Sequence, residues 1–464
     1  MKYKHNILIL LSIFCLLNCT KCNDKKQNKD LLLLSLLLNQ NTSIIFPRGI
    51  IDTEFGDNGF IKDLDKLFNL NSVSITLSDI KIQKDGKFIV SGIYNNGILK
   101  YSILIRFNAN GSIDNSFDYN GIVIFKVGDE SPENTYIFIQ DDNKILICGN
   151  YLNSGADETF LARFNSNGSF DTSFGLNGIK KIDIDNSTTV EKVKDIKINK
   201  EGNIIITGYY GNPPSNYDIF IAKFDSIGNP ITNFGTNGII KKVITSNQDY
   251  PEKLLILNDG KILIGGISYS GTSNYNIFLI RYNNDGTIDN TFGTNGITIT
   301  DVNFSLQEDI LNSFIILNDG SIMICGYTKQ SGINIPLIGK YNSDGNLNST
   351  FGNNGFKTFT LFNSSAIFYD LAIQLDGKIL LGGSFDNDIN LNDSFMLRLN
   401  ENLELDESFG INGIFTNDVA YTLEQYHKND YIDKFLLLPE GKILILGNYN
   451  DINNSSSNYI LQLK

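Results

Sequence analysis

The chain has 464 residues, 41% of them hydrophobic and 11% aromatic, so it can bury a sizeable core and is not an intrinsically disordered protein. It carries 51 acidic and 38 basic residues, a formal net charge of −13 at pH 7. This balance excludes a partner that is held by bulk positive charge, so we expect neither nucleic acid nor an anionic lipid surface.

Residues 1–18 predict an export signal, because Lys2 and Lys4 precede an apolar run from Ile7 to Leu17. The next residues, LLNC at 16–19, resemble a bacterial lipobox, and that resemblance implies cleavage before Cys19 and a lipid on its sulfur. Asn18 departs from the small residue usual at its position, so an ordinary secretory signal or an uncleaved anchor is the alternative. We expect a lipoprotein of the bacterial cell envelope, on the outer membrane or the cell surface, held to the membrane by this lipid only.

Residues 19–42 follow as a lipidated tether that contains a leucine-rich run, Leu31 to Leu38. Eight helical residues rise only about 12 Å, which is too short for a hydrocarbon layer of roughly 30 Å. The run is therefore not a membrane span. A helix at the membrane interface and a short helix docked on the folded domain both remain open.

Residues 43–464 are repetitive. A motif of the form FGxNG recurs at intervals of 57 to 62 residues, and its Asn-Gly dipeptide suits the positive φ of a tight turn. The phenylalanines that mark it are Phe55, Phe117, Phe174, Phe234, Phe292, Phe351 and Phe409. The chain therefore contains seven repeats, which start near residues 49, 111, 168, 228, 286, 345 and 403.

Each repeat predicts four strands, which we call A to D. Strand A follows Asn-Gly, strand B precedes a turn of the form DGK, and strand C follows it as an apolar run, as in KILIGG after Asp259. Strand D ends in a basic residue and an aromatic one, as in FLIRY at 278–282. Strand C is apolar at successive positions, so we expect both of its faces to be buried. Cys148 and Cys325 fall on it at one shared position and are expected to be small buried hydrophobes, not disulfide partners.

Four short antiparallel strands repeated seven times predict an all-β fold, a seven-bladed β-propeller of four-stranded blades. A β-solenoid is the competing fold, which the tight DGK hairpins disfavour. The two motifs together, of the form ARFNxDGSLDxSFGxNG and QxDGKIxxxG, resemble the delta-60 repeat proteins over residues 49–464. The resemblance implies a propeller in a bacterial exported protein and brings no activity or catalytic residue with it.

The basic residue of strand D varies together with an acidic residue eight positions later. Where the base is Arg the acid is Asp, whereas Lys223 is matched by Ile231 and Lys340 by Asn348. Bidentate pairing with a carboxylate is available to Arg and not to Lys, so we predict an ion pair that braces the corner between strands D and A. The four predicted pairs are Arg106 with Asp114, Arg163 with Asp171, Arg281 with Asp289, and Arg398 with Asp406.

The same corner resembles a calcium loop at Asn283, Asp285, Gly286 and Asp289, but the closing Glu of an EF-hand is absent. An Asx turn explains these residues without a metal. We expect no metal and no cofactor.

Up-and-down connectivity places the A–B and C–D loops on one face of the disc and the repeated turns on the other. The loops of the first face vary in length and are rich in Tyr, Asn, Ser and Gly, a composition typical of adaptable recognition surfaces, although solvated loops free to drift would look the same. The candidate binding residues on this face are Tyr209, Tyr210, Tyr217, Tyr269, Tyr275, Tyr327 and Tyr449.

The inventory for catalysis is small. His427 is the one histidine that remains after the export signal, and carboxylate pairs such as Asp386 with Asp388 or Glu130 with Glu133 are too common here to single out a site. We therefore expect a monomeric binding module rather than an enzyme, with a protein or glycan partner at the loop face or at the mouth of the central channel. A carboxylate-dependent carbohydrate enzyme and a purely structural envelope protein are the alternatives.

The sequence does not determine how the ring closes. Either the two ends of the repeat array abut, or the N-terminal segment adds an edge strand to a terminal blade. Because Gln462 replaces the basic residue in the last repeat, we expect the closing corner to lose its brace.

Overall fold

The computed structural model describes residues 48–68, 74–128, 132–185, 190–212, 216–271, 274–302, 307–362, 364–386, 392–417, 429–450 and 456–464. The chain divides into two compact units, residues 1–45 and 46–464, and every described residue belongs to the second. The export signal, Cys19 and the leucine-rich run lie outside the described residues. Among the described residues no helix is long and apolar enough to cross a membrane.

The described part of the chain is all-β apart from one short 3-10 helix, η1 (Leu64–Phe68). Five sheets have four antiparallel strands each, paired in chain order. The first two sheets consist of β2 (Ser74–Ile82), β3 (Phe88–Asn95), β4 (Lys100–Phe107) and β5 (Ile122–Phe125), and of β6 (Pro132–Ile139), β7 (Ile145–Asn153), β8 (Ala156–Phe164) and β9 (Ile179–Ile182). The next three consist of β10 (Val190–Ile198), β11 (Ile204–Asn212), β12 (Asn216–Phe224) and β13 (Ile239–Lys242), of β14 (Asp249–Ile256), β15 (Ile262–Tyr269), β16 (Tyr275–Tyr282) and β17 (Ile297–Thr300), and of β18 (Asp309–Ile316), β19 (Ile322–Gln330), β20 (Ile333–Tyr341) and β21 (Phe356–Thr358).

A sixth sheet has eight strands. It contains β22 (Ala366–Ile373), β23 (Ile379–Asp386), β24 (Asn392–Leu399), β25 (Ile414–Asn417), β26 (Asn429–Leu437), β27 (Ile443–Asn450), β28 (Ser456–Leu463) and β1 (Phe60–Ile61). A single parallel bridge, between Asn392 and Asn429, joins β24 to β26. The sheet thus consists of two antiparallel halves, β22–β25 and β26–β28 with β1.

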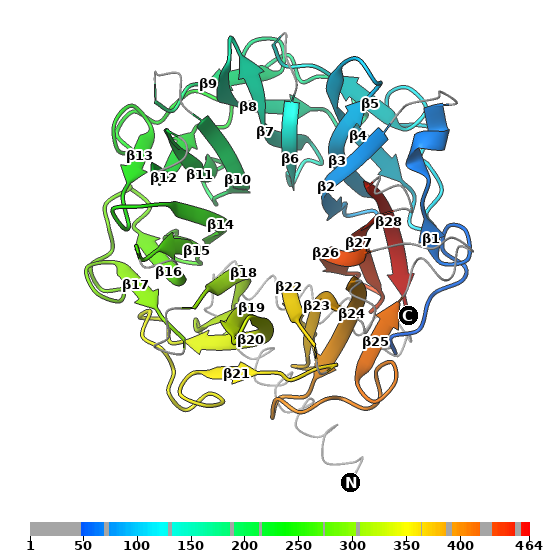
Figure 1. Cartoon of the computed structure of the whole chain (residues 1–464). Helices are drawn as coiled ribbons and strands as arrows, with labels where there is room; N and C mark the ends of the chain where they lie inside the picture. Colours follow the sequence, from blue (N-terminus) through cyan, green and yellow to red (C-terminus); the bar gives the residue numbers. More distant parts are fainter. Residues whose placement is uncertain are drawn as a thin grey trace, which may run out of the picture. The chain divides into compact units, whose positions relative to one another are not determined.

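The sheets stand side by side around a central axis, in chain order (Figure 1). Strands β2, β6, β10, β14, β18, β22 and β26 lie nearest the axis, and the short strands β5, β9, β13, β17, β21 and β25 lie at the outside (Figure 1). Each sheet therefore runs B, C, D and A from the axis outward. These findings confirm an all-β, propeller-like fold built from four-stranded antiparallel repeats.

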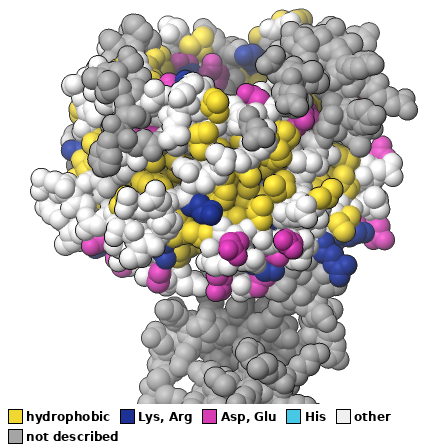
Figure 2. Space-filling view, turned by 60° about the horizontal axis from the view of Figure 1, so that its bottom comes forward, with side chains coloured by type: hydrophobic (Ala, Val, Ile, Leu, Met, Phe, Trp, Pro, Cys, Tyr) yellow, Lys and Arg dark blue, Asp and Glu magenta, His cyan; other side chains and the backbone are white. Residues whose placement is uncertain are grey.

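The core lies between neighbouring sheets. Strand C is buried on both faces as expected: Ile262, Leu263 and Ile264 of β15 are each 0% exposed. Cys148 and Cys325 are also 0% exposed and free, which confirms their prediction as buried hydrophobes. Outer strands are less covered, and Figure 2 shows hydrophobic side chains over the outer wall, above a rim where acidic and basic side chains gather.

The repeated turns adopt the backbone conformation that their residues predict. In each FGxNG motif both Asn and Gly have positive φ, as in Asn295 at 53° and Gly296 at 87°, a pair of values that suits a type I′ turn. Asn143, which replaces the turn glycine in the second DGK motif, has φ of 61°. The substitution therefore keeps the left-handed conformation.

Every axial strand carries a β-bulge, which explains a glycine that recurs in strand C. The register of β18 against β19 shifts between Leu311 and Ser313, and the bulge drives the carbonyl of Ile310 toward Gly326. A Cβ on Gly326 would lie 1.8 Å from that oxygen. The equivalent glycines Gly92, Gly208, Gly266 and Gly383 meet the same obstacle at 1.8–2.1 Å.

At the D–A corners the structure places each predicted Arg in contact with its Asp. The Nε to Oδ2 distances are 2.7 Å for Arg106–Asp114, 2.8 Å for Arg163–Asp171, 2.7 Å for Arg281–Asp289 and 2.7 Å for Arg398–Asp406. A lysine from the DGK turn joins each of these carboxylates at 2.8–2.9 Å, contributed by Lys87, Lys144, Lys261 and Lys378. Burial raises the pKa of these four carboxyl groups, but hydrogen bonds from the lysine and from the Ser or Thr two positions later, together with the arginine, hold it well below its ordinary value.

The expectation of bidentate pairing was wrong. Arg281 donates to Asp289 through Nε only, because its Nη1 donates to the carbonyl oxygen of Ser343 in the neighbouring sheet. Its guanidinium also lies over the ring of the marker residue Phe292, 4.5 Å from the centroid. The corner arginine thus connects two sheets, and its delocalised, multi-donor head is what a lysine lacks.

Ring closure follows the second of the two expected routes. Strand β1 pairs antiparallel with β28, so the N-terminal segment supplies the outer strand of the last sheet (Figure 1). Gly410 donates to the carbonyl oxygen of Arg48 at 2.7 Å, the same bond that Gly56 makes to Asn110 at 2.9 Å between consecutive corners. The first and last repeats are therefore joined by the same backbone hydrogen bond as other neighbours.

Candidate functional site

Five tyrosines form one aromatic cluster at the A–B/C–D face, which we call the tyrosine patch. Its members sit at the strand ends next to the variable loops: Tyr209 on β11, Tyr217 on β12, Tyr250 on β14, Tyr269 on β15 and Tyr275 on β16. The patch therefore spans the sheets β10–β13 and β14–β17.

The rings of the patch are in continuous contact. Tyr250 is central, with ring centroids 5.0 Å from Tyr209, 5.6 Å from Tyr217 and 6.3 Å from Tyr275. Tyr269 extends the cluster at 5.2 Å from Tyr275. The Tyr209–Tyr250 and Tyr269–Tyr275 pairs are edge-to-face and the other two are tilted, and such packing restricts the side chains, so the patch is a preformed surface.

The patch also has defined polar groups. The Oε1 atom of Gln248 accepts hydrogen bonds from the hydroxyls of Tyr250, at 3.1 Å, and Tyr275, at 3.0 Å. Burial raises the pKa of Tyr209 to about 12 and also raises that of Tyr275. Half-buried rings with fixed hydroxyl donors can bind a partner by stacking and by hydrogen bonds together.

Four of the seven tyrosines predicted from sequence belong to the patch, and three do not. Tyr210 points to the other side of β11, where Lys241 Nζ lies 4.7 Å from its ring centroid. Tyr327 lies on β19 in the next sheet, and burial raises its pKa to about 12. Tyr449 is 4% exposed and belongs to the core. The prediction that it is a binding residue on the surface was therefore wrong.

Tyr250 was not predicted from the sequence, because it lies outside the C–D loops that hold the predicted tyrosines. Tyr250 stands on an axial strand that begins after an A–B loop. Tyr250 and its neighbours Tyr209 and Tyr217 belong to different sheets, and only the arrangement of the sheets around the ring brings them together.

A second polar feature surrounds the axis and was also missed. The residue six positions before each DGK turn faces the axis directly after the bulge, and we call this set the axial belt. Its members are Asp79, Tyr136, Asp195, Lys253, Ser313, Asp370 and Lys434. A constant offset from the DGK motif is the sequence signal that could have found it.

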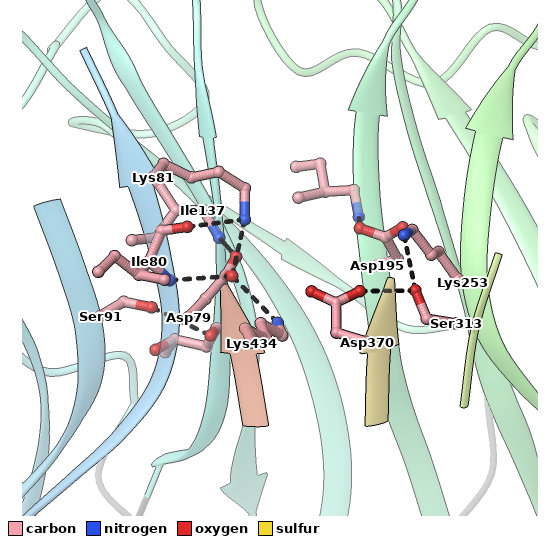
Figure 3. Close-up of polar contacts among 12 residues, drawn as sticks. Asp79, Ile80, Lys81, Ser91, Ile137, Asp195, Lys253, Ser313, Asp370 and Lys434 are labelled. Carbon is pink, nitrogen blue, oxygen red and sulfur yellow. Dashed lines mark hydrogen bonds and ion pairs between the residues drawn. The ribbon is translucent and has the colours of Figure 1, made fainter. Parts of the chain in front are cut away.

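Asp79 is the centre of one half of the belt (Figure 3). Its Oδ1 atom lies 2.7 Å from Lys81 Nζ and 3.0 Å from Lys434 Nζ, although Lys434 comes from the last repeat. Burial alone would raise the pKa of Asp79, but the two ammonium groups hold it well below its ordinary value. Asp79 is therefore a buried, permanently charged group that ties the last sheet to the first.

The other half of the belt is a chain of hydrogen bonds across three sheets (Figure 3). Lys253 Nζ donates to Ser313 Oγ at 2.9 Å, and Ser313 Oγ donates to Asp370 Oδ1 at 2.8 Å. Asp195 Oδ2 and Asp370 Oδ2 each accept a backbone N–H from the next axial strand, Leu254 at 2.9 Å and Phe435 at 3.3 Å. The belt carboxylates thus satisfy backbone amides of the neighbouring axial strands.

The residues considered for catalysis do not assemble into a site. His427, Glu130 and Asp388 lie outside the described residues, so the two carboxylate pairs remain untested. No group of three or more His, Cys, Asp or Glu side chains that could hold a metal occurs in the described part of the chain. In the described part of the chain, the tyrosine patch and the axial belt both bring together polar side chains from different sheets.

The fold and the repeats together define a β-propeller repeat protein. Six segments match the family described as "Domain of unknown function (DUF5122) beta-propeller": residues 83–117, 140–174, 257–292, 317–351, 374–409 and 438–464. Each segment runs from a DGK turn through strands C and D, ending at or near a marker phenylalanine or at the C-terminus. Among curated proteins, none matches the chain in sequence.

Several solved structures are similar to this chain at low identity. A polysaccharide lyase, Uly1, is 11% identical, with a TM-score of 0.47, over 83% of this chain and 89% of that one. A "PL25-Ulvanlyase" bound to -[GlcA(1-4)Rha3S]- is 12% identical, with a TM-score of 0.46, over 82% and 90%. A protein of unknown function from Dyadobacter fermentans is 9% identical, with a TM-score of 0.42, over 88% and 100%. Similarities of this size carry no argument about activity.

Proposed function

We propose that this chain is an exported, lipid-anchored propeller of the delta-60 repeat type that binds a protein or glycan partner on its A–B/C–D face. We count the eight-stranded sheet as two blades, since one parallel bridge is all that joins its halves, and this count makes the propeller seven-bladed. Export and lipidation rest on the lipobox resemblance at Cys19.

The tyrosine patch is the observation that carries this proposal. Its five rings are packed against each other across two sheets, so little side-chain entropy is lost when a partner covers them. The loops beside it differ from repeat to repeat, whereas the turns of the opposite face repeat almost unchanged. A surface that differs among otherwise equal repeats is where selectivity can reside.

The test is an array of glycans and proteins probed with residues 46–464, the compact unit of the fold. The patch variant Tyr250→Ala with Tyr275→Ala removes the centre of the cluster and should weaken every true hit at least tenfold. Tyr119→Ala is the matched control, because Tyr119 is a tyrosine of the opposite face and is 79% exposed. Hits that the patch variant still binds and that Tyr119→Ala no longer binds would place the binding site on the face of the repeated turns and contradict the proposal.

The anchor has a separate test. Cys19→Ser should move the protein from the membrane fraction to the soluble fraction, and the mature wild-type protein should carry a lipid on its N-terminal residue in mass spectra. An unmodified Cys19 within an intact N-terminal segment would refute the lipoprotein assignment and leave the binding proposal standing.

A further inference from the structure

One D–A corner lacks the carboxylate of the brace and one of its two cations. In the sheet β10–β13 the four positions that hold the arginine, its aspartate, the DGK lysine and a Ser or Thr in the four braced corners are occupied by Lys223, Ile231, Asn203 and Asn233. The carboxylate and one of the two cations have therefore been removed together. The remaining cation, Lys223, has lost the group that neutralises its equivalents.

Lys223 is a buried cation without an ion pair in the described structure. It is 5% exposed, and its Nζ donates to the carbonyl oxygen of Asn284 at 2.7 Å and to Asn284 Oδ1 at 2.8 Å. Both acceptors are neutral, and burial lowers the pKa of the ammonium group, although the charges of Glu201 and Asp285 oppose this shift. A buried cation without an ion pair is costly, which marks this corner as a candidate for a ligand that supplies a carboxylate in direct contact.

The other lysine corner differs in this respect. Lys340 also replaces the arginine, and Asn348 replaces the aspartate, but Lys340 Nζ lies 3.5 Å from Asp319 Oδ2 of the adjacent turn. Its charge is balanced within the chain. The loss of the arginine by itself thus does not create the situation found at Lys223.

A pocket opens where the brace is missing. Its volume is about 460 Å³, and its lining includes Lys223, Asn203, Asn233, Ile231 and Asp285. The amides supply neutral donors and acceptors, and Asp285 supplies a carboxylate on the neighbouring corner. Hydrogen bonds from the hydroxyl and backbone N–H of Thr287 lower the pKa of Asp285, so this carboxyl group is ionised.

We propose that this pocket binds a small zwitterionic acid, with its carboxylate on Lys223 and its ammonium group toward Asp285. The ligand carboxylate takes the role that an aspartate has in the braced corners, where it neutralises the cation of strand D. A second negative charge would be repelled by Asp285, and an acid without an amino group would leave Asp285 unmatched. Free amino acids have this charge pattern and fit within the volume.

The experiment titrates residues 46–464 with glycine, acetate and succinate by calorimetry at constant ionic strength. A parallel measurement follows acetylation of Lys223 by mass spectrometry, with Lys340 in the same protein as the internal reference. We expect glycine to bind at least tenfold more tightly than acetate or succinate and to slow labelling of Lys223 alone. No heat with glycine at about 10 mM, or acetate binding as tightly as glycine, would overturn the proposal.

Two variants locate the site. Lys223→Met should abolish glycine binding, whereas Lys340→Met should leave it unchanged. Because Lys223→Met can also disturb folding, Ile231→Asp gives a second test: it restores a carboxylate beside Lys223 and should weaken glycine binding at least tenfold without lowering the urea midpoint. Unchanged glycine binding in Ile231→Asp would show that the ligand does not meet Lys223.

Discussion

Lys442 Nζ lies 2.6 Å from Asp52 Oδ2, although the two residues belong to opposite ends of the repeat array. Asp52 occupies the position of the corner aspartates and is 1% exposed, and Lys464 adds a second cation at 3.5 Å. The expectation that the closing corner loses its brace was therefore wrong. Gln462 does replace the arginine, but the DGK lysine of the last repeat keeps the carboxylate paired.

Breaking this contact should weaken closure of the ring. We expect Asp52→Asn or Lys442→Met to lower the free energy of unfolding by about 1–2 kcal/mol, less than for a fully buried pair because the Lys442 side chain is 34% exposed. Urea titration measures the effect. The control is Lys66→Met, which removes an exposed pair with Asp63 and should change stability by at most about 0.5 kcal/mol.

The corner arginines should not be replaceable by lysine. Arg281→Lys can keep the contact with Asp289 or the one with the carbonyl oxygen of Ser343, but not both. We expect a loss of about 1–3 kcal/mol in urea titrations. Lys223→Arg is the matched reverse change, and it should gain no stability, because Ile231 stands where the aspartate would be needed. Equal stability of Arg281→Lys and the wild type would contradict the bridging role.

The strand C glycine should be intolerant of any side chain. Gly326→Ala would place a methyl group 1.8 Å from the carbonyl oxygen of Ile310, so the bulge must move, at an expected cost of about 3 kcal/mol or more. Gly155→Ala is the control: it has φ of 89° but no atom within 4 Å, and should cost about 1 kcal/mol. Similar losses in the two variants would mean that backbone conformation, not space, selects this glycine.

Stability should have a maximum in mildly acidic solution. Burial raises the pKa of Asp249 and of Asp309 to about 6, so the folded state takes up protons that the unfolded state still lacks as the pH falls from about 7 toward 4. The free energy of unfolding therefore rises over that window. Asp249→Asn should flatten this rise by about 1–3 kcal/mol between about pH 7.5 and pH 5 in urea titrations.

The corner aspartates act in the opposite direction. Their pKa is lowered in the folded state, so the stability they contribute is present above the ordinary carboxyl pKa of 3.8 and is lost as the pH falls below it. The unfolding free energy should fall steeply below about pH 4, and less steeply in Asp289→Asn. An unfolding free energy that does not fall below about pH 4 would contradict the corner assignment, and one that rises continuously from about pH 5 to pH 7.5 would contradict the assignment of Asp249 and Asp309.

Much of the fold could be predicted because each repeat contains the residues that form its turns. Asn295 and Gly296 impose a tight turn wherever they stand, and the apolar run of strand C requires cover on both faces. The covariation of Arg281 with Asp289 was readable because both residues belong to one corner, eight positions apart. The geometry of the pair could not be predicted, because the guanidinium donates both to Asp289 and to a carbonyl oxygen of the next sheet.

The sequence by itself determined the period, the strand order, the turns and the identity of the corner pairs, all of which depend on residues close together in the chain. Only the tertiary structure decided that Tyr250 completes the tyrosine patch, that Asp79 is paired by Lys434, and that Lys223 is buried without a carboxylate partner. The physical reason is that these contacts join different sheets. Their geometry depends on how the ring closes and on a bulge that changes which side chains face the axis.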